Sequence, residues 1–191
     1  AIPLAGRHNL LNALAAVAVA GTLGAEPEAI IAAMPAFRGV RRRMEVFLES
    51  RGMIFVDDFA HHPTAIRETI AAARGRWPER RLRVLFEPRS NTTVTNRFQA
   101  ELTEAFVQAD EVWLGPIHRA ERIADDERLN REALVAELKT RGIEAHCGED
   151  AAQMAGEVLA GGRAGDLVLI MSNGAFGGIY QKFQELTGDG S

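Results

Sequence analysis

The sequence predicts an α/β protein: a Rossmann-like domain with a mainly parallel sheet and helices on both faces, preceded by a short helical segment. Two observations support this fold class. From residue 53 onward, short apolar runs typical of buried strands alternate with longer segments of helical pattern. Crossover connections between such units are right-handed, which gives a Rossmann-like topology. In contrast, the first 44 residues contain helical pattern only.

The first part of the chain is dominated by one apolar helix. Residues 8–23 are rich in alanine and apolar on nearly every side; Gly24 ends this helix, and Pro27 begins a second, shorter one. A helix that is apolar all round is expected to be buried. We therefore interpret residues 1–44 as the end of a domain whose remainder lies upstream, followed by a linker. The two helices are expected to pack on the chain's own surface or against another copy.

The second predicted domain covers residues 45–191. It begins with a hairpin whose strands lie at 46–48 and 53–56, on either side of a Ser-Arg-Gly turn. Strands and helices then alternate to the end of the chain. We expect helices at 65–74, 96–107, 131–141, 151–159 and 179–186, and strands at 82–86, 111–114, 143–146 and 167–171.

Composition excludes several classes of partner. A net charge of −4 argues against a broad basic surface for nucleic acid. The apolar run at residues 10–23 is interrupted by Asn12 and is too short to span a bilayer, so no membrane partner is predicted. The single Cys147 excludes an internal disulfide and fits a reducing compartment, which favours a cytoplasmic protein.

The stretch D-D-F-A-H-H-P-T lies where the second strand of the hairpin ends and a helix begins. It brings together Asp57, Asp58, His61 and His62, and the carboxyl ends of parallel strands are where ligands bind in such sheets. One alternative is a polar turn in which Asp58 or Thr64 only caps the helix. Another is a metal-dependent phosphohydrolase that uses the two acids and two histidines as ligands. Against it, adjacent residues of a strand point to opposite faces.

Two other strands end in distinctive loops. Arg89, in E-P-R-S-N-T at residues 87–92, suits a substrate carboxylate or phosphate, although an ion pair with Glu87 is an equal alternative. The glycine-rich residues 172–178 resemble an anion-binding loop, a weak signal because such turns are common. All three loops are expected at the same edge of the sheet, and their convergence predicts one shared ligand pocket.

Several of these segments resemble the Mur ligases, ATP-dependent amide-forming enzymes of cell-wall peptide synthesis. The resemblance rests on residues 6–16 (G-R-H-N-L-L-N-A-L-A-A), 39–45 (G-V-R-R-R-M-E) and 57–64. Within the family, F-E-P-R-S-N-T and S-N-G-A-F-G-G-I are most similar to the peptidoglycan-recycling branch. That branch joins UDP-N-acetylmuramate to the murein tripeptide L-Ala-γ-D-Glu-meso-diaminopimelate. The branch that adds L-alanine is the alternative; it typically has a tyrosine in place of Phe59.

The resemblance implies a three-domain enzyme of which this chain is the carboxyl-terminal part. Residues 1–44 match the end of the central ATPase domain, and residues 45–191 match the Rossmann-like last domain. ATP and Mg²⁺ are the implied cofactors, but no G-x-x-G-K-[ST] loop occurs in the chain. We therefore expect this chain alone to be inactive. In the family reaction, a carboxylate attacks the γ-phosphate of ATP, and an amine then attacks the resulting acyl phosphate.

The resemblance also assigns roles to individual residues. The predicted nucleotide contacts are His8, Asn9 and Asn12 near the adenine, and Arg43, Asp58 and His61 near the ribose and phosphates. Asp58 and His61 are also the predicted catalytic residues. For His8 and Asn9, helix capping is the alternative role. The predicted contacts of the incoming amine substrate are Arg89, Ser90, Asn91, Asn173 and Phe176, with Arg89 pairing with a peptide carboxylate.

Overall fold

The computed structural model describes residues 6–37 and 39–188, and its elements follow the predicted order. Two helices come first, α1 (Arg7–Thr22) and α2 (Pro27–Ala33), with a 3₁₀ turn at Met34–Ala36. The predicted hairpin is formed by β1 (Glu45–Ser50) and β2 (Met53–Asp58). The remaining elements are α3 (Pro63–Arg76), β3 (Arg81–Phe86), α4 (Gln99–Ala105), β4 (Glu111–Leu114), α5 (Arg131–Thr140), β5 (Glu144–Cys147), α6 (Ala151–Ala160), β6 (Asp166–Met171) and α7 (Ile179–Thr187).

The strands form one sheet in the order β1-β2-β6-β3-β4-β5 within the described part of the chain. β1 pairs antiparallel with β2, and every other pairing is parallel. β6 lies between β2 and β3, and all six of its residues, D-L-V-L-I-M, are buried. A continuous apolar run is what a strand covered on both faces requires. The predicted α/β class and mainly parallel sheet are confirmed.

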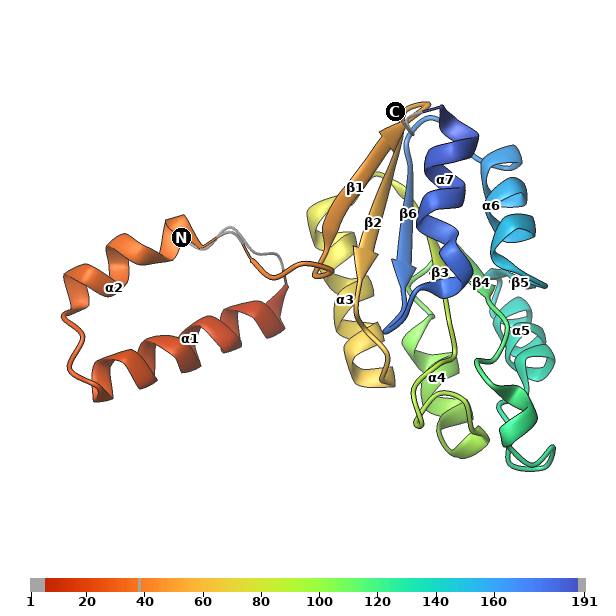
Figure 1. Ribbon diagram of the computed structural model, residues 1–191, viewed down its shortest axis with the longest axis horizontal. Coiled ribbons are helices and arrows are strands. Elements are labelled where there is room, and N and C mark those ends of the chain that lie inside the picture. The colour runs from red at the N-terminus through yellow and green to blue at the C-terminus, as the bar shows by residue number, and fades with distance from the viewer. Residues whose placement is uncertain (1–5, 38, 189–191) are drawn as a thin grey trace.

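The two faces of the sheet carry different helices (Figure 1). One apolar core joins the sheet to α3, α4 and α5, through residues such as Ile66, Leu102 and Leu134. The other joins it to α6 and α7, through Met154 and Phe183 among others. The sheet is therefore the middle of three layers, and its carboxyl edge is left open between the helices.

The helices α1 and α2 extend away from this domain as a separate arm (Figure 1). No residue described in either helix is buried, and Leu23 and Ile31 expose 82% and 71% of their surface. The first predicted alternative, that packing on the chain's own surface hides these apolar side chains, is therefore wrong: α1 contacts α2 and α3, but the apolar side chains stay exposed. The second alternative, that another copy of the chain covers the apolar side chains of α1 and α2, stays a prediction. Among the described residues, no helix is both long and apolar enough to cross a membrane.

Candidate active site at the carboxyl edge of the sheet

Three loops meet at the carboxyl edge because β2, β6 and β3 are neighbours in the sheet. Ser172 begins the loop after β6; its amide donates to the Asp58 carbonyl at 3.1 Å, and its hydroxyl donates to the Glu87 carboxylate. The Ser90 hydroxyl, in the loop after β3, donates to the His61 carbonyl at 2.9 Å. The predicted convergence of the three loops is confirmed, since each is hydrogen-bonded to another. No residue of the loop after β2 lines the cavity beside Arg89, so one ligand pocket shared by all three loops stays a prediction.

Arg89 lies across the loop that follows β6. A Cβ atom on Gly174 would come within 2.3 Å of the Arg89 Nε, so only glycine allows the guanidinium to pack here. The Arg89 Nη1 lies 3.5 Å from Oε1 of Glu87 and 3.1 Å from Nδ1 of His118. The ion pair with Glu87 is therefore present. Because 31% of the Arg89 side chain stays exposed, it can also bind an anion.

A cavity of about 620 Å³ opens beside Arg89, and we call it the rim pocket. Loops after β3, β4 and β6 form its walls, together with the start of α6 and one side chain of α7. Phe176, 2% exposed, supplies its apolar wall, and the missing side chain of Gly115 makes room for the Phe176 ring. The charged or titratable lining residues are Glu87, Arg89, His118, Arg119, Asp150 and Lys182. With three cations at its wall, the pocket suits a ligand that carries carboxylates.

Four of these lining residues were missed by the sequence analysis: His118, Arg119, Asp150 and Lys182. His118 and Arg119 follow β4, whose end lies at the same edge as the other three strand ends, so the loop after this strand was a usable signal. Arg119 adopts a left-handed backbone, with φ of 54°. Asp150 is the N-cap of α6, in the short loop after β5, so the end of this strand was also a usable signal. Lys182 lies on α7, and only the packing of this helix brings it to the pocket.

The other predicted substrate residues have different surroundings. Ser90 braces the loops, since its hydroxyl also contacts Thr93 Oγ1 at 2.9 Å. Asn91 is exposed and lines a separate cavity of about 270 Å³ with Arg97 and Glu127 among its walls. Asn173 does not line the rim pocket, and its Oδ1 is buried without a hydrogen-bond partner among the described residues. Their substrate contacts stay predictions.

His61 and Arg43 both pack against Phe59. The His61 ring packs edge-on at 5.3 Å between centroids, and the Arg43 guanidinium carbon is 5.5 Å from the Phe59 centroid. The His61 Nδ1 lies 2.8 Å from the Phe59 carbonyl oxygen. Because a carbonyl only accepts, this nitrogen carries the proton, and Nε2 is left as an acceptor in the neutral ring. The Arg43 guanidinium can donate to phosphate oxygens, whereas Nε2 of the neutral His61 ring cannot, so a phosphate contact of His61 would need the ring protonated at both nitrogens and stays a prediction.

Asp58 faces inward, with 2% of its surface exposed. Its Oδ1 accepts from the Ala60 amide at 2.8 Å and from the Thr69 hydroxyl at 3.2 Å, and its Oδ2 accepts from the Met44 amide at 3.0 Å. Burial raises the pKa of Asp58, although the hydrogen bonds from Ala60 and Met44 act in the opposite direction. These bonds show that Asp58 braces the loop and the linker. Its predicted nucleotide and catalytic roles stay predictions.

Replacing Asp58 with asparagine is expected to lower the free energy of unfolding by about 1–3 kcal/mol, because the new amide group turns one acceptor into a donor facing another donor. Urea denaturation of this chain measures the effect. Asp126→Asn is the matched control, since Asp126 is exposed. Equal stability of Asp58→Asn and the wild-type protein would show that the three hydrogen bonds contribute nothing.

The side chains of Asp57 and His62 also accept hydrogen bonds from other groups of the protein. Asp57 lies on the opposite face of β2 from Asp58, where it accepts hydrogen bonds from Arg42 and Tyr180. The Nδ1 of His62 accepts from the Thr64 amide at 3.4 Å, so His62 caps α3, and not Asp58 or Thr64 as in the simple capping alternative.

The metal site of the phosphohydrolase alternative is not formed. Among the described residues, the group that brings three ligand atoms within 4.8 Å of one another is Glu111, Glu144 and His146, not the Asp-Asp/His-His cluster. In that group, the guanidinium of Arg81 already binds the carboxylates of Glu111 and Glu144. The two aspartates fail to share an ion because successive residues of a strand point to opposite faces.

The predicted adenine contacts lie on the arm. Asn9 is half-buried and Asn12 is exposed, both on α1, and the side chain of His8 lies outside the described residues. Figure 1 shows α1 beside the domain and not over the loops of the rim. These three contacts stay predictions that depend on where the arm lies in the longer protein.

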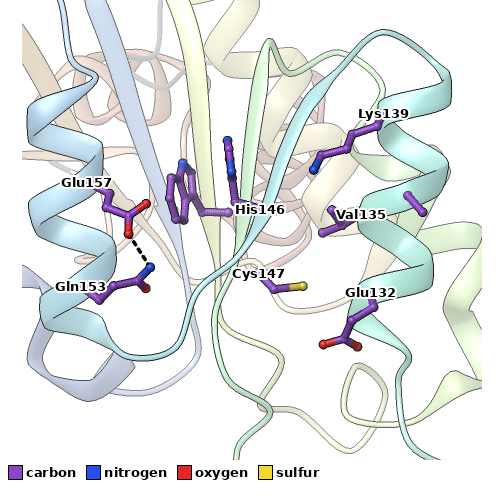
Figure 2. Close-up of a pocket in the computed structure, with 9 residues that line it drawn as sticks. Glu132, Val135, Lys139, His146, Cys147, Gln153 and Glu157 are labelled. Carbon is purple, nitrogen blue, oxygen red and sulfur yellow. Dashed lines mark hydrogen bonds between the residues drawn. The ribbon is translucent and has the colours of Figure 1, made fainter.

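A second cavity, of about 400 Å³, lies away from the rim between α5 and α6, along the edge strand β5 (Figure 2). His146 stacks on Trp113 at 4.3 Å between ring centroids, and Cys147 lies on the opposite face of the strand. Burial raises the pKa of the Cys147 thiol, so the thiol stays protonated and is a poor nucleophile.

The fold and the rim define a Rossmann-like domain with a ligand site at its carboxyl edge, and comparison with known proteins identifies its family. The family model described as Mur ligase, glutamate ligase domain, matches residues 42–174. The chain belongs to the Mur ligase family. It is 40% identical over 173 residues to a UDP-N-acetylmuramate–L-alanine ligase of Roseiflexus sp., covering 90% of the chain and 36% of that protein. It is 39% identical over 181 residues to the UDP-N-acetylmuramate–L-alanyl-γ-D-glutamyl-meso-2,6-diaminoheptandioate ligase of Escherichia coli, covering 94% and 37%.

Solved structures agree with the fold. The UDP-N-acetylmuramate–alanine ligase of Thermotoga maritima has a TM-score of 0.79 at 23% identity, covering all of this chain and 40% of that one. A murein peptide ligase from Psychrobacter arcticus has a TM-score of 0.75 at 31% identity, covering 98% and 38%. The chain thus spans well under half the length of each of these four proteins.

Proposed function

We propose that this chain is the carboxyl-terminal part of an ATP-dependent ligase that joins UDP-N-acetylmuramate to the tripeptide L-Ala-γ-D-Glu-meso-diaminopimelate through an acyl phosphate. One observation carries the choice of a peptide: the rim pocket, at about 620 Å³, is far larger than a single alanine needs, and Arg89, Arg119 and Lys182 line it. The tripeptide carries several carboxylates, whereas alanine carries one. Pairing these carboxylates with the cations of the pocket would orient the amine for attack.

We further propose that residues 1–44 complete a central ATPase domain in the longer protein. The exposed apolar side chains of α1, such as Leu14 at 55% and Val19 at 57%, would then be covered by the rest of that domain. The short share of each relative that the chain matches supports this arrangement. Without a phosphate loop, the chain alone is not expected to ligate.

The rim residues fit ATP better than they fit Mg²⁺. Arg43, packed on Phe59, would hold phosphate oxygens, and His61 would add a hydrogen bond when its ring is protonated at both nitrogens. ATP would supply the phosphoryl group that activates the carboxylate. Both aspartates after β2 are already bound to protein donors, Asp57 to Arg42 and Asp58 to backbone amides. Mg²⁺ prefers such carboxylates, so we assign its ligands to the upstream part of the longer protein. Of the solved relatives, an ADP complex is described for a MurF ligase of Thermotoga maritima.

A UDP-N-acetylmuramate–L-alanine ligase is the second candidate. It is favoured by the relatives themselves, because the Roseiflexus enzyme with this name is as similar to the chain as the tripeptide ligase of Escherichia coli. Its chemistry would be the same, with a smaller amine substrate.

The test is a comparison of amine substrates in the full-length protein that contains this chain. With ATP and UDP-N-acetylmuramate present, we expect the kcat/KM for the tripeptide to exceed that for L-alanine by about 100-fold, equivalent to about 2.7 kcal/mol of transition-state binding. Phosphate release gives the rate, and mass spectrometry identifies the product. A preference for L-alanine would select the second candidate, and no amide product with either amine would reject both.

A further inference from the structure

The linker between the arm and the sheet is held firmly at its last three residues, Arg42 to Met44. The Arg42 carbonyl accepts from the Phe59 amide at 2.9 Å, and the Arg42 amide donates to the Glu45 carboxylate at 2.7 Å. Met44 is 5% exposed, and its amide donates to Asp58 at 3.0 Å. These bonds join the end of the linker to the loop that follows β2.

The Arg42 side chain extends the attachment to a second loop. Its Nε donates to Oδ2 of Asp57 at 2.9 Å, and its Nη2 donates to the Ser172 carbonyl at 2.8 Å and to the Tyr180 hydroxyl at 3.0 Å. The Tyr180 hydroxyl donates in turn to Oδ1 of Asp57 at 2.8 Å. Burial and the neighbouring Asp57 raise the pKa of Tyr180, so its hydroxyl stays protonated as a donor. One guanidinium therefore joins the linker, β2, the loop after β6 and α7.

The backbone of this segment is strained, which shows that these contacts determine it. Arg42 and Met44 have φ of 58° and 52°, in the left-handed region that disfavours residues with side chains. Such conformations persist only where surrounding contacts hold them. The neighbouring Arg41 differs: it is exposed and has no side-chain hydrogen bond or ion pair among the described residues.

We propose that Arg42, Asp57, Asp58 and Tyr180 form an anchor that fixes the end of the linker to the rim, so that the arm turns about residues before Arg42. The loops after β2 and β6 then keep one position relative to the sheet while the arm moves. In this arrangement the paired aspartates serve the linker, and Arg42, Asp57 and Tyr180 are positioning residues for the rim loops.

Amide hydrogen exchange and ¹⁵N relaxation of this chain test the anchor. In the wild-type protein we expect order parameters of about 0.85 at residues 42–44 and clearly lower values at 40 and 41. In Arg42→Met, we expect the Phe59 and Met44 amides to exchange at least about 10-fold faster, equivalent to about 1.4 kcal/mol. Amides in the core strands, such as those of Val84 and Leu169, should change less than about twofold if only the anchor opens.

Arg41→Met is the matched control, because it removes the same group one residue earlier and should leave the Phe59 exchange rate unchanged. Tyr180→Phe removes one member of the network and should give a smaller increase than Arg42→Met. The anchor is rejected if residues 42–44 of the wild-type chain are as mobile as residues 40 and 41. It is also rejected if Arg42→Met exchanges like Arg41→Met, or if exchange rises equally throughout the sheet.

A second experiment, which rests on the proposed function, uses the full-length protein. Arg42→Met should lower kcat about 10-fold or more while the KM for the amine substrate changes less than about twofold, because Arg42 does not line the rim pocket. Arg42→Lys, which keeps the charge, should recover part of kcat. A rise in KM with kcat unchanged would contradict a positioning role. Absence of ligase activity in the wild-type protein would reject the proposed function, and the exchange experiment would still decide the anchor.

Discussion

Replacing Glu111 with glutamine is expected to lower the free energy of unfolding by about 3 kcal/mol, because it removes the nearer of the two counter-charges of the buried Arg83 guanidinium and leaves only Asp166, at 3.6 Å. Glu111 and Arg83 expose 1% and 2% of their surface. The Glu111 carboxylate accepts from the Arg83 Nε at 2.6 Å and Nη2 at 2.8 Å, and also from the Trp113 indole. Urea denaturation at neutral pH measures the loss.

The same pair predicts a dependence on pH. Burial raises the pKa of Glu111, but the hydrogen bonds from Arg83 and Trp113 outweigh it and hold the pKa below its ordinary value of 4.5. A lowered pKa in the folded state stabilises the protein above the unfolded-state pKa, and this stabilisation is lost as the pH falls through the folded-state pKa. The difference in stability between the wild-type protein and Glu111→Gln should therefore be constant above about pH 5.5 and shrink below pH 4.5.

Two further variants identify the cause of this loss. Glu137→Gln makes the same change in an exposed ion pair with Arg141, at 3.0 Å, and should have a much smaller effect. Arg83→Met in the Glu111→Gln background removes the under-compensated charge and should recover part of the lost stability. If the double variant is no more stable than Glu111→Gln, an under-compensated charge on Arg83 is not the main cause of the loss.

Replacing Arg89 with alanine in the full-length ligase is expected to lower kcat/KM for the tripeptide by about 30- to 1,000-fold. When the bound peptide covers Arg89, its carboxylate and the guanidinium form a buried, hydrogen-bonded charge pair, and loss of one partner of such a pair costs about 2–4 kcal/mol. Each 1.36 kcal/mol changes kcat/KM about tenfold. Arg89 is the cation of the rim pocket that Glu87 and His118 hold in position. Because the carboxylate of the peptide is bound before and during attack, the effect should appear mainly in the KM for the amine.

Arg97→Ala is the matched control for this prediction. Arg97 is exposed and lines the smaller cavity beside Asn91, so its removal should change kcat/KM less than about threefold, as expected for a surface charge. The KM values for ATP and UDP-N-acetylmuramate should not change in either variant. If Arg89→Ala loses thermal stability but keeps its KM for the tripeptide, Arg89 serves only the ion pair with Glu87.

Much of the site was predictable because it depends on the ends of strands. A parallel sheet brings successive strand ends to one edge, so the loops beginning at Asp57, Glu87 and Ser172 had to lie close together once the strands were identified. The opposite orientations of Asp57 and Asp58 also follow from the pleat of β2. For the same reason the sequence itself argued against a metal site made of these two residues.

The remaining features needed the tertiary structure. Asp58 points inward because α3 covers that face of β2. Its hydrogen-bond partner Met44 belongs to the linker, and no local sequence pattern predicts the left-handed backbone of Met44. Lys182 reaches the rim pocket only through the packing of α7.

The sequence by itself determined the alternation of strands and helices, the family resemblance and the edge of the sheet at which the chemistry lies. These features depend on the spacing of apolar residues, on turn residues and on short motifs, all of which are local properties of the sequence. Tertiary structure alone decided the strand order, the buried pairing of Arg83 with Glu111 and the attachment of Arg42 to Asp57 and Tyr180. The physical reason is that such contacts join residues far apart in the chain, and their free energy depends on burial, which no local segment specifies.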